Sequence, residues 1–154
     1  MTLENYESKS GTFIPVWTLE IQTPIEDVDK ILDAVIAVYP LSYGRYERNA
    51  SVSAQGMETS QPMAGSTTKA HSDGFSAGQT ETYSMVELKI SIERDENILA
   101  TVMDAIHYAH HYEEPVIFLR EVWASRAAYS PDNDNPNRWW NNGRGMPNKI
   151  DSIS

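Results

Sequence analysis

The chain of 154 residues contains no cysteine, which excludes disulfide bonds, thiolate metal sites and cysteine catalysis. It also has no apolar run near the roughly 20 residues that a membrane-spanning helix needs. Residues 1–11 are polar and contain no apolar stretch of the kind found in secretory signals. These absences predict a cytoplasmic protein without a membrane partner.

Positive charge is scarce as well. Twelve Lys and Arg residues stand against 22 Asp and Glu residues, which gives a formal net charge of -10. Because nucleic acids and anionic membranes bind basic surfaces, neither is an expected partner. The surplus of carboxylates is compatible with a cationic ligand or a metal ion, although acidity by itself chiefly favours solubility.

Composition divides the chain into three parts. Residues 13–128 carry the apolar patterning of one domain, residues 1–12 are predicted to be a disordered N-terminal segment, and residues 129–154 an extended tail. Within the domain, residues 56–80 are rich in Gly, Ser, Thr and Ala and predict a long loop. A loop of that length in a compact domain is more often functional or disordered than neutral.

Alternating apolar residues predict strands at 17–22, 46–54 and 86–93. A helix is expected to begin with a capping box of Thr23, Pro24 and Glu26 and to end at Pro40. A second helix, capped by Asp95, is indicated by the spacing of its apolar residues, which are Ile98, Val102, Ala105, Ile106 and Ala109. Residues 116–123 are apolar on both faces, as in a central strand.

The resulting order of elements, β-α-β followed by a loop and a second β-α-β, predicts an α+β protein of ferredoxin-like βαββαβ architecture. Such a fold has an antiparallel four-stranded sheet with both helices on one face. The other face then needs a cover, and in a chain of this size the cover is expected to come from copies of the same chain.

The run of residues 110–115, between the second helix and the last strand, concentrates side chains that can do chemistry. His107 and His111 have the i, i+4 spacing of a two-histidine metal pair, and His110 and Glu113 could complete a site for zinc, copper or nickel. The alternative is structural, because histidines also suit the C-terminal end of a helix, where carbonyls lack partners.

Two further groups are candidates for binding. An anion pocket between subunits could be formed by arginines, namely Arg45, Arg48, Arg94, Arg120 and Arg126, although arginines in an acidic chain often pair with local carboxylates instead. Of these, Arg45, Arg48 and Arg120, together with Tyr46, are the candidate ligand-binding residues. In the predicted loop, His71 and Asp73 are candidates, and Lys69 is the only cation there. The adjacent Trp139 and Trp140 are unusual in a polar tail and predict docking on the sheet or on a neighbouring subunit.

The junction at residues 110–115 has the pattern His-x-Tyr-Glu-Glu-Pro, and in this setting it resembles the PII/CutA-like proteins. One relative is the divalent-cation tolerance protein CutA, a PII-like trimer. The other is the domain inserted in GTP-cyclohydrolase-type-2-like dinuclear metal proteins. A second motif resembles that inserted domain, and its residues are Gly44-Arg45-Tyr46, Ala50-Ser51, Gly56, Pro62 and Gly65-Ser66.

The resemblance covers roughly residues 14–126 and implies that Tyr112 packs while Glu113 and Glu114 bond to backbone or to a neighbouring subunit. It also implies that residues 56–80 correspond to the PII T-loop, which reaches toward ligands and partners. The chain departs from the pattern at His111, where proline is usual. Since the inserted domain is not where its relatives carry their metal ligands, the resemblance does not imply cyclohydrolase chemistry.

Three functions remain open at this point. The first is a PII/CutA-like homotrimer that binds a small ligand or a metal ion and signals through residues 56–80. The second is a metal-dependent hydrolase that uses the histidine cluster with Glu113 as general base. The third is an oligomerisation domain without a ligand. The residues favour a protein that is not an enzyme, and no Ser-His-Asp arrangement stands out.

Overall fold

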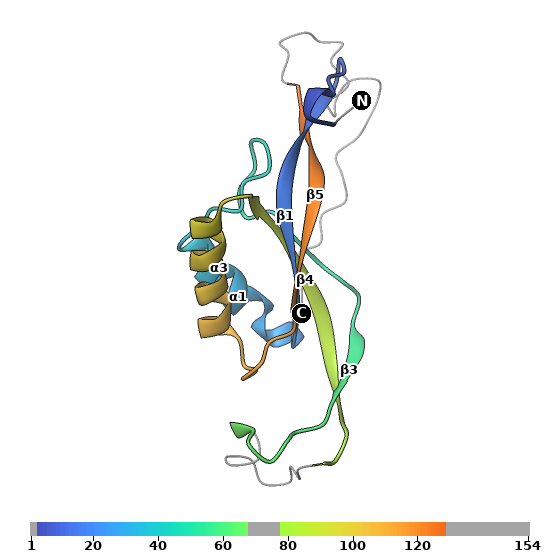
Figure 1. Cartoon of the computed structure of the whole chain (residues 1–154), viewed down its shortest axis with the longest axis vertical. Coiled ribbons are helices and arrows are strands. Elements are labelled where there is room, and N and C mark those ends of the chain that lie inside the picture. The colour runs from blue at the N-terminus through green and yellow to red at the C-terminus, as the bar shows by residue number, and fades with distance from the viewer. Residues whose placement is uncertain (1–2, 68–77, 129–154) are drawn as a thin grey trace.

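The computed structural model describes residues 3–67 and 78–128. Its main elements, in chain order, are β1 (Gly11–Thr23), α1 (Val28–Ile36), β2 (Ala50–Val52), β3 (Gly56–Ser60), β4 (Glu81–Glu93), α3 (Glu96–Ala109) and β5 (Ile117–Ala127). Short 3-10 helices lie at Leu3–Asn5 and Ile25–Asp27. Both α-helices pack on the same face of one antiparallel sheet (Figure 1), which confirms the predicted ferredoxin-like α+β fold.

The sheet has the order β2-β4-β1-β5. β3 pairs with residues 81–85, the first residues of β4. It therefore contains five strands rather than the predicted four, because the second strand is interrupted. After Val52 the chain leaves the ladder, and Ser53 is held to β4 by hydrogen bonds with the backbone of Glu87. Pairing with β4 then resumes at Gly56.

The sheet is longer than the helical layer. Residues 11–15 of β1 pair only with β5, and residues 81–85 of β4 pair only with β3. Each of these two-stranded ribbons extends past the helices, at opposite ends of the molecule (Figure 1). We call the ribbon of β3 and residues 81–85 the β3–β4 arm.

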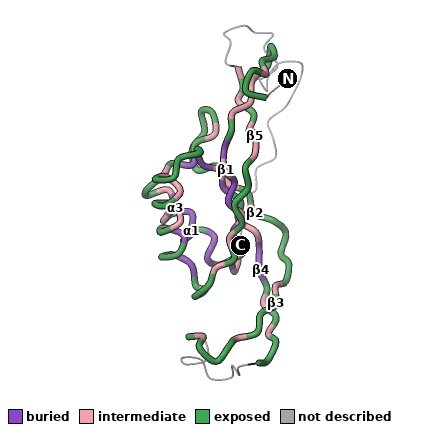
Figure 2. The backbone as a smooth tube through the Cα atoms, in the orientation of Figure 1, coloured by how far each residue is buried: buried purple, intermediate pink, exposed green. Residues whose placement is uncertain are grey.

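The core lies between the helices and the inner face of β1 and β4 (Figure 2). Its fully buried side chains come from every third or fourth residue of the helices and every second residue of the strands, and they include Leu19, Ile21, Leu88, Ile90, Ile31, Val35, Val102 and Ile106. Leu41 completes the core from the loop after α1, at a positive φ of 52°. A leucine in that region is strained, and its burial holds it there.

The start of the first helix differs from the prediction. Thr23 is buried at the end of β1, and its hydroxyl donates to the carbonyl of Pro24 instead of capping a helix. A 3-10 turn follows, and no side-chain cap bonds either helical segment. The predicted capping box of Thr23, Pro24 and Glu26 is therefore wrong, and α1 ends at Ile36, before Pro40.

Three other boundaries also shift. Residues 3–12, within the predicted N-terminal segment, form a 3-10 helix, a bridge to β1 and the first residues of β1 itself. The predicted strand at 46–54 shortens to β2, because Gly44 and Arg48 adopt positive φ values of 61° and 58° and turn the chain. The predicted loop at 56–80 begins with the strand β3.

The last strand is not central. β5 pairs with β1 alone among the strands that the structure describes, and Phe118 and Leu119 are 50% and 43% exposed. Its apolar residues on both faces lie at an edge of the sheet. The predictions for His71, Asp73, Lys69 and the tail with Trp139 and Trp140 fall outside the described residues.

The predicted cap of the second helix is confirmed. The carboxylate of Asp95 accepts hydrogen bonds from the backbone N–H groups of Asn97 and Ile98 at 2.8 and 3.0 Å. Replacing Asp95 with Ala should lower the free energy of unfolding by about 1 kcal/mol, measured by urea denaturation, because these donors lose their acceptor. The matched control is Asp29→Ala in the first turn of α1, and an equal loss there would contradict the capping role.

Candidate functional site

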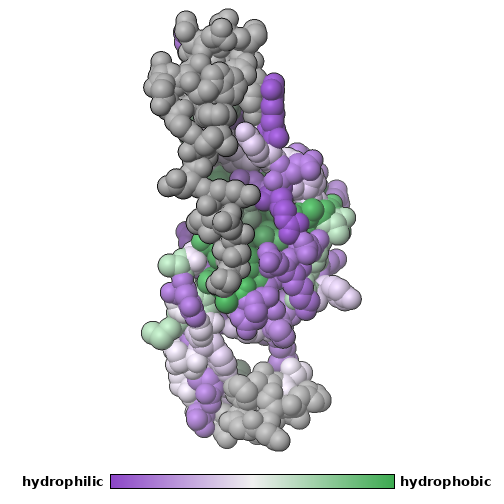
Figure 3. All heavy atoms as spheres, turned by 180° about the vertical axis from the view of Figure 1, so that it is seen from behind, coloured by the Kyte–Doolittle hydropathy of each residue, from purple (hydrophilic) through white to green (hydrophobic). Residues whose placement is uncertain are grey.

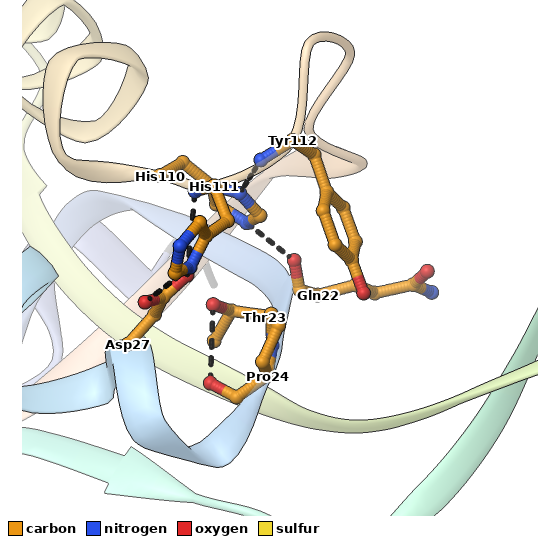
Figure 4. Close-up of polar contacts among 7 residues, drawn as sticks. All are labelled: Gln22, Thr23, Pro24, Asp27, His110, His111 and Tyr112. Carbon is orange, nitrogen blue, oxygen red and sulfur yellow. Dashed lines mark hydrogen bonds and ion pairs between the residues drawn. The ribbon is translucent and has the colours of Figure 1, made fainter. Parts of the chain in front are cut away.

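The polar residues of the junction lie where three segments meet: the end of β1, the start of α1 and the chain that leaves α3 (Figure 4). Of the four polar residues that are buried in the described chain, Thr23, Asp27 and His110 belong to this place. Buried polar groups are expensive unless they are paired, so their hydrogen bonds determine how the three segments fit together.

His110 ends α3 and turns its ring inward, with only 7% of the residue exposed. Its Nδ1 accepts from the backbone N–H of Tyr112 at 3.0 Å, which leaves Nε2 to carry the proton and donate to the carbonyl of Gln22 at 2.7 Å. Both nitrogens are therefore satisfied by the neutral ring. Burial lowers the pKa of His110 below its ordinary value of 6.5, in agreement with this tautomer.

His111 points the other way, toward solvent at its far edge. Its Nδ1 lies 2.8 and 2.7 Å from the two carboxylate oxygens of Asp27, whose side chain is only 4% exposed. The backbone N–H of His111 also donates to this carboxylate at 3.3 Å. The pair ties the start of α1 to the segment after α3, and it orients the imidazole so that Nε2 faces outward (Figure 4).

Tyr112 joins the junction to the β3–β4 arm. Its ring lies 4.8 Å from that of His110 and 6.5 Å from that of Tyr83 on β4, between ring centroids. Burial, followed by a hydrogen bond with Glu58 of β3, raises the pKa of Tyr112 well above its ordinary value of 10.0. The phenol therefore stays protonated at neutral pH, beside the carboxylate of Glu58.

Glu113 reaches the connection between β3 and β4 (residues 61–80). Its Oε2 accepts from the backbone N–H of Thr67 at 2.9 Å. Hydrogen bonds from Thr67 lower the pKa of Glu113, so the side chain is a carboxylate at neutral pH. Tyr112 and Glu113, which are neighbours in the sequence, thus hold both β3 and the first residues of the β3–β4 connection.

Two buried oxygen atoms beside these contacts have no partner among the described residues: Oε1 of Glu58 and Oγ of Ser66. Glu58 is the carboxylate beside Tyr112, and Ser66 precedes the residue that Glu113 holds. Buried oxygens normally receive a hydrogen bond from protein, water or ligand. Both atoms can accept one, and the carboxylate favours a donor that carries positive charge.

The structure does not bring the predicted metal ligands together in one chain. α3 ends at Ala109 and His110 is extended, so His107 and His111 do not share a helix face. His110 has both nitrogens occupied, and Glu113 bonds to Thr67. Among residues 3–67 and 78–128, no group of three or more His, Cys, Asp or Glu side chains is placed to hold a metal ion.

The predicted anion-binding residues are also spread over the molecule. Arg48 pairs with Asp33 of α1 at 2.6 Å, on the side of the sheet that carries the helices. Arg120 pairs with Glu20 at 3.1 Å on the opposite face, and Tyr46 is 73% exposed in the loop after α1. Together with Arg45 in the same loop, these residues do not share a face, so a common pocket would need more than one chain.

Sequence reasoning located the junction but missed its partners, which are Gln22, Asp27, Glu58 and Thr67. One signal was available. Asp27 directly precedes Val28 and lies four residues before Ile31, so a carboxylate stands beside the apolar stripe of α1, where it must be buried and paired. Glu58 and Thr67 gave no such signal, because they stand in a stretch without apolar periodicity.

No protein-family model and no curated protein matches the chain. Solved structures do resemble it. The NIF3-related protein of Bacillus cereus is 21% identical with a TM-score of 0.56, over 78% of this chain and 29% of that one. The periplasmic divalent cation tolerance protein CutA of Archaeoglobus fulgidus is 13% identical with a TM-score of 0.48, over 71% of this chain and 84% of that one.

A third structure is CPII, a nitrogen regulatory PII-like protein of Thiomonas intermedia bound to ADP, AMP and bicarbonate. It is 11% identical with a TM-score of 0.45, over 75% of this chain and 92% of that one. The strand order and the likeness to the NIF3-related protein give this chain the PII/CutA-like fold. The chain spans 29% of the length of that NIF3-related protein.

No helix within the described ranges is long and apolar enough to cross a membrane.

The neutral ring of His110 predicts a specific pH dependence of stability. Because its pKa is lowered from 6.5 in the fold, the unfolded chain binds the extra proton first as the pH falls. This contribution to stability is complete above about pH 6.5 and decreases as the pH falls toward the lowered pKa. Urea denaturation at pH 7.5 and 5.5 should show a smaller decrease for His110→Gln than for the unmodified protein.

The matched control is His107→Gln, which removes an exposed imidazole from the last turn of the same helix. Between pH 7.5 and 5.5, the free energy of unfolding of His107→Gln should decrease as much as that of the unmodified protein. If the two variants behaved alike, protonation of His110 would not be the cause.

Proposed function

We propose that the protein is a binding module without catalytic activity. A small ligand binds beside Tyr112 and changes how the β3–β4 connection is held. The observation that carries this proposal is the contact of the junction with the region where the connection begins and ends: Glu113 accepts from the backbone N–H of Thr67 at 2.9 Å, and the ring of Tyr112 lies 6.5 Å from that of Tyr83 on β4. A ligand that changes one of these contacts changes how the connection is held.

The unpartnered oxygens suggest the chemistry of the ligand. Oε1 of Glu58 and Oγ of Ser66 both accept hydrogen bonds, and Glu58 is a negative charge next to a phenol that stays protonated. A small molecule that bears an ammonium group or several N–H donors would satisfy them, as would a divalent cation. The net charge of -10 likewise favours a positively charged ligand.

The response follows from population shift. A ligand favours the arrangement of residues 61–80 in which its own contacts are complete, and it shifts the equilibrium by its difference in affinity between arrangements. Since the connection is held at Thr67 by the same junction, the surface shown to a partner would depend on occupancy. The hydrolase alternative gains no support, because Glu113 is bonded to Thr67 rather than placed beside the histidines.

Limited proteolysis tests this proposal. Cleavage between residues 61 and 80 should fall roughly tenfold or more when a binding ligand is present far above its Kd. The panel is Zn²⁺, Cu²⁺, Ni²⁺, adenine nucleotides and primary amines of increasing size. Unchanged cleavage with every member at saturating concentration would remove the support for a responsive connection.

Glu58→Gln supplies the matched variant for a responding ligand, because it removes the negative charge and keeps the shape. It should reduce the protection, whereas Glu114→Gln should not, since Glu114 makes no hydrogen bond or ion pair with the described residues. A response that survives in Glu58→Gln would place the ligand elsewhere.

We also propose that the protein assembles with copies of itself. The outer edge of β5 has eleven residues, from Ile117 to Ala127, and no strand of the described ranges pairs with it. Such an edge is normally paired or protected. The resemblance noted in the sequence implies a trimer, which would also allow Arg45, Arg48, Tyr46 and Arg120 of different copies to meet.

The assembly is tested by light scattering of the full chain during gel filtration. Three copies of 17.4 kDa are expected to elute together at micromolar concentration. A single copy at that concentration would contradict the proposed assembly. Replacing Leu119 with Lys on the edge strand should then weaken it, because a charge on an edge opposes pairing.

A further inference from the structure

The two ring nitrogens of His111 lie in different surroundings. Nδ1 lies 2.8 and 2.7 Å from the two carboxylate oxygens of Asp27 (Figure 4), while Nε2 makes no hydrogen bond with the described residues. The side chain of Asp27 is only 4% exposed, whereas that of His111 is 67% exposed. One nitrogen is therefore held by a buried anion, and the other is presented to solvent.

The carboxylate of Asp27 determines what Nε2 of His111 can do. An imidazole nitrogen so close to a carboxylate carries a proton, so in the neutral ring the free lone pair is on Nε2. The same carboxylate can balance the positive charge that develops on the ring when Nε2 attacks an electrophile, as the aspartate of a Ser-His-Asp triad does for its imidazolium. His111 is thus an oriented nucleophile whose Nε2 takes no part in tying the segments together.

The other two histidines of the described chain lack this arrangement. His110 is buried, and its nitrogens are bonded to Gln22 and Tyr112. His107 is exposed in the last turn of α3, but none of the described carboxylates holds its ring. Nucleophilic reactivity at a ring nitrogen should therefore be concentrated on His111.

The surroundings of Nε2 distinguish between the uses of such a ring. A metal site needs further ligands, and the described residues contain no group of three or more His, Cys, Asp or Glu side chains placed to hold an ion. A catalytic base needs a pocket for its substrate, but the concave surface lined by Gln55, Met57 and Tyr83 belongs to the β3–β4 arm. A chemical group delivered by a second protein needs neither, because the donor brings its own binding surface.

We propose that Nε2 of His111 accepts a phosphoryl group from a second protein. The lone pair of Nε2 attacks phosphorus, and the bond from phosphorus to the leaving group breaks. The leaving group keeps the electron pair of that bond and takes a proton from water. Nδ1 keeps its own proton, and the Asp27 carboxylate balances the positive charge of the phosphorylated ring. Phosphoryl transfer is favoured over acyl transfer, because an N-acyl imidazole is hydrolysed rapidly in water whereas an N-phosphoryl imidazole persists.

The position of His111 suits a donor protein. On the face shown in Figure 3, hydrophobic surface that another chain would cover lies in the middle of the molecule, bordered by hydrophilic residues. His111 instead follows α3, at the end of the helical layer from which the β3–β4 arm extends (Figure 1). A phosphoryl group there would add roughly two negative charges directly before Tyr112 and Glu113. The proposal does not depend on the ligand proposed above.

Phosphoramidate, a small phosphoryl donor whose leaving group is ammonia, tests the acceptor on the full-length protein. Mass spectrometry of its peptides should show phosphorylation of His111 at least about tenfold faster than that of His107, because only His111 is held by a carboxylate. Phosphorus NMR should show the Nε2 isomer, since Nδ1 faces Asp27. In concentrated urea, which unfolds the chain, the two histidines should react at equal rates.

Asp27→Asn is the matched variant, because its amide keeps the shape and can accept from Nδ1 but carries no charge. It should slow phosphorylation of His111 roughly tenfold, while circular dichroism reports the fold. Asp29→Asn, which removes an exposed charge from the first turn of α1, should not slow it. Equal rates at His111 and His107 in the folded protein, an Nδ1 isomer, or an unchanged rate in folded Asp27→Asn would each overturn the proposal. If Asp27→Asn does not fold, the comparison of the two histidines and the isomer formed decide the question.

Discussion

The antiparallel pairing of β1 is the constraint on which the rest of the structure depends. This strand lies between β4 and β5 and is bonded to both along most of its length. Its inner side chains, Leu19 and Ile21, are the floor on which both helices pack, and hydrophobic burial on that floor is the main stabilising term. Every functional residue discussed above is placed relative to it.

The end of β1 then determines the junction. Gln22 offers its carbonyl to His110, and the turn after Thr23 brings Asp27 to His111. The segment after α3 is therefore held at two points by the chain that follows β1. Only because that segment is fixed can Tyr112 and Glu113 reach Glu58 and Thr67, which belong to the arm. The three consecutive residues His111, Tyr112 and Glu113 therefore connect the arm to the core.

Much of this fold could be predicted from the sequence, because periodicity reports burial. The alternation in residues 86–92 and the spacing of Val102, Ile106 and Ala109 gave the correct elements and the correct side of each. The start of α1 could not be predicted, because Thr23 is a residue type that often caps helices but here is the last residue of β1. The spacing of His107 and His111 could not be interpreted from the sequence for a related reason: it places two side chains on one face only within a helix, and α3 ends at Ala109.

The interrupted second strand and the unequal lengths of strand and helix have a mechanical consequence. β4 has thirteen residues, or about 44 Å at the rise of a strand, whereas the nine residues of α1 span about 14 Å. The β3–β4 arm thus projects about 17 Å from the shorter part of the sheet that the helices cover. A tilt of about 5° at its base would move its tip by about 1.5 Å over that length, so small changes at the base are enlarged at the tip.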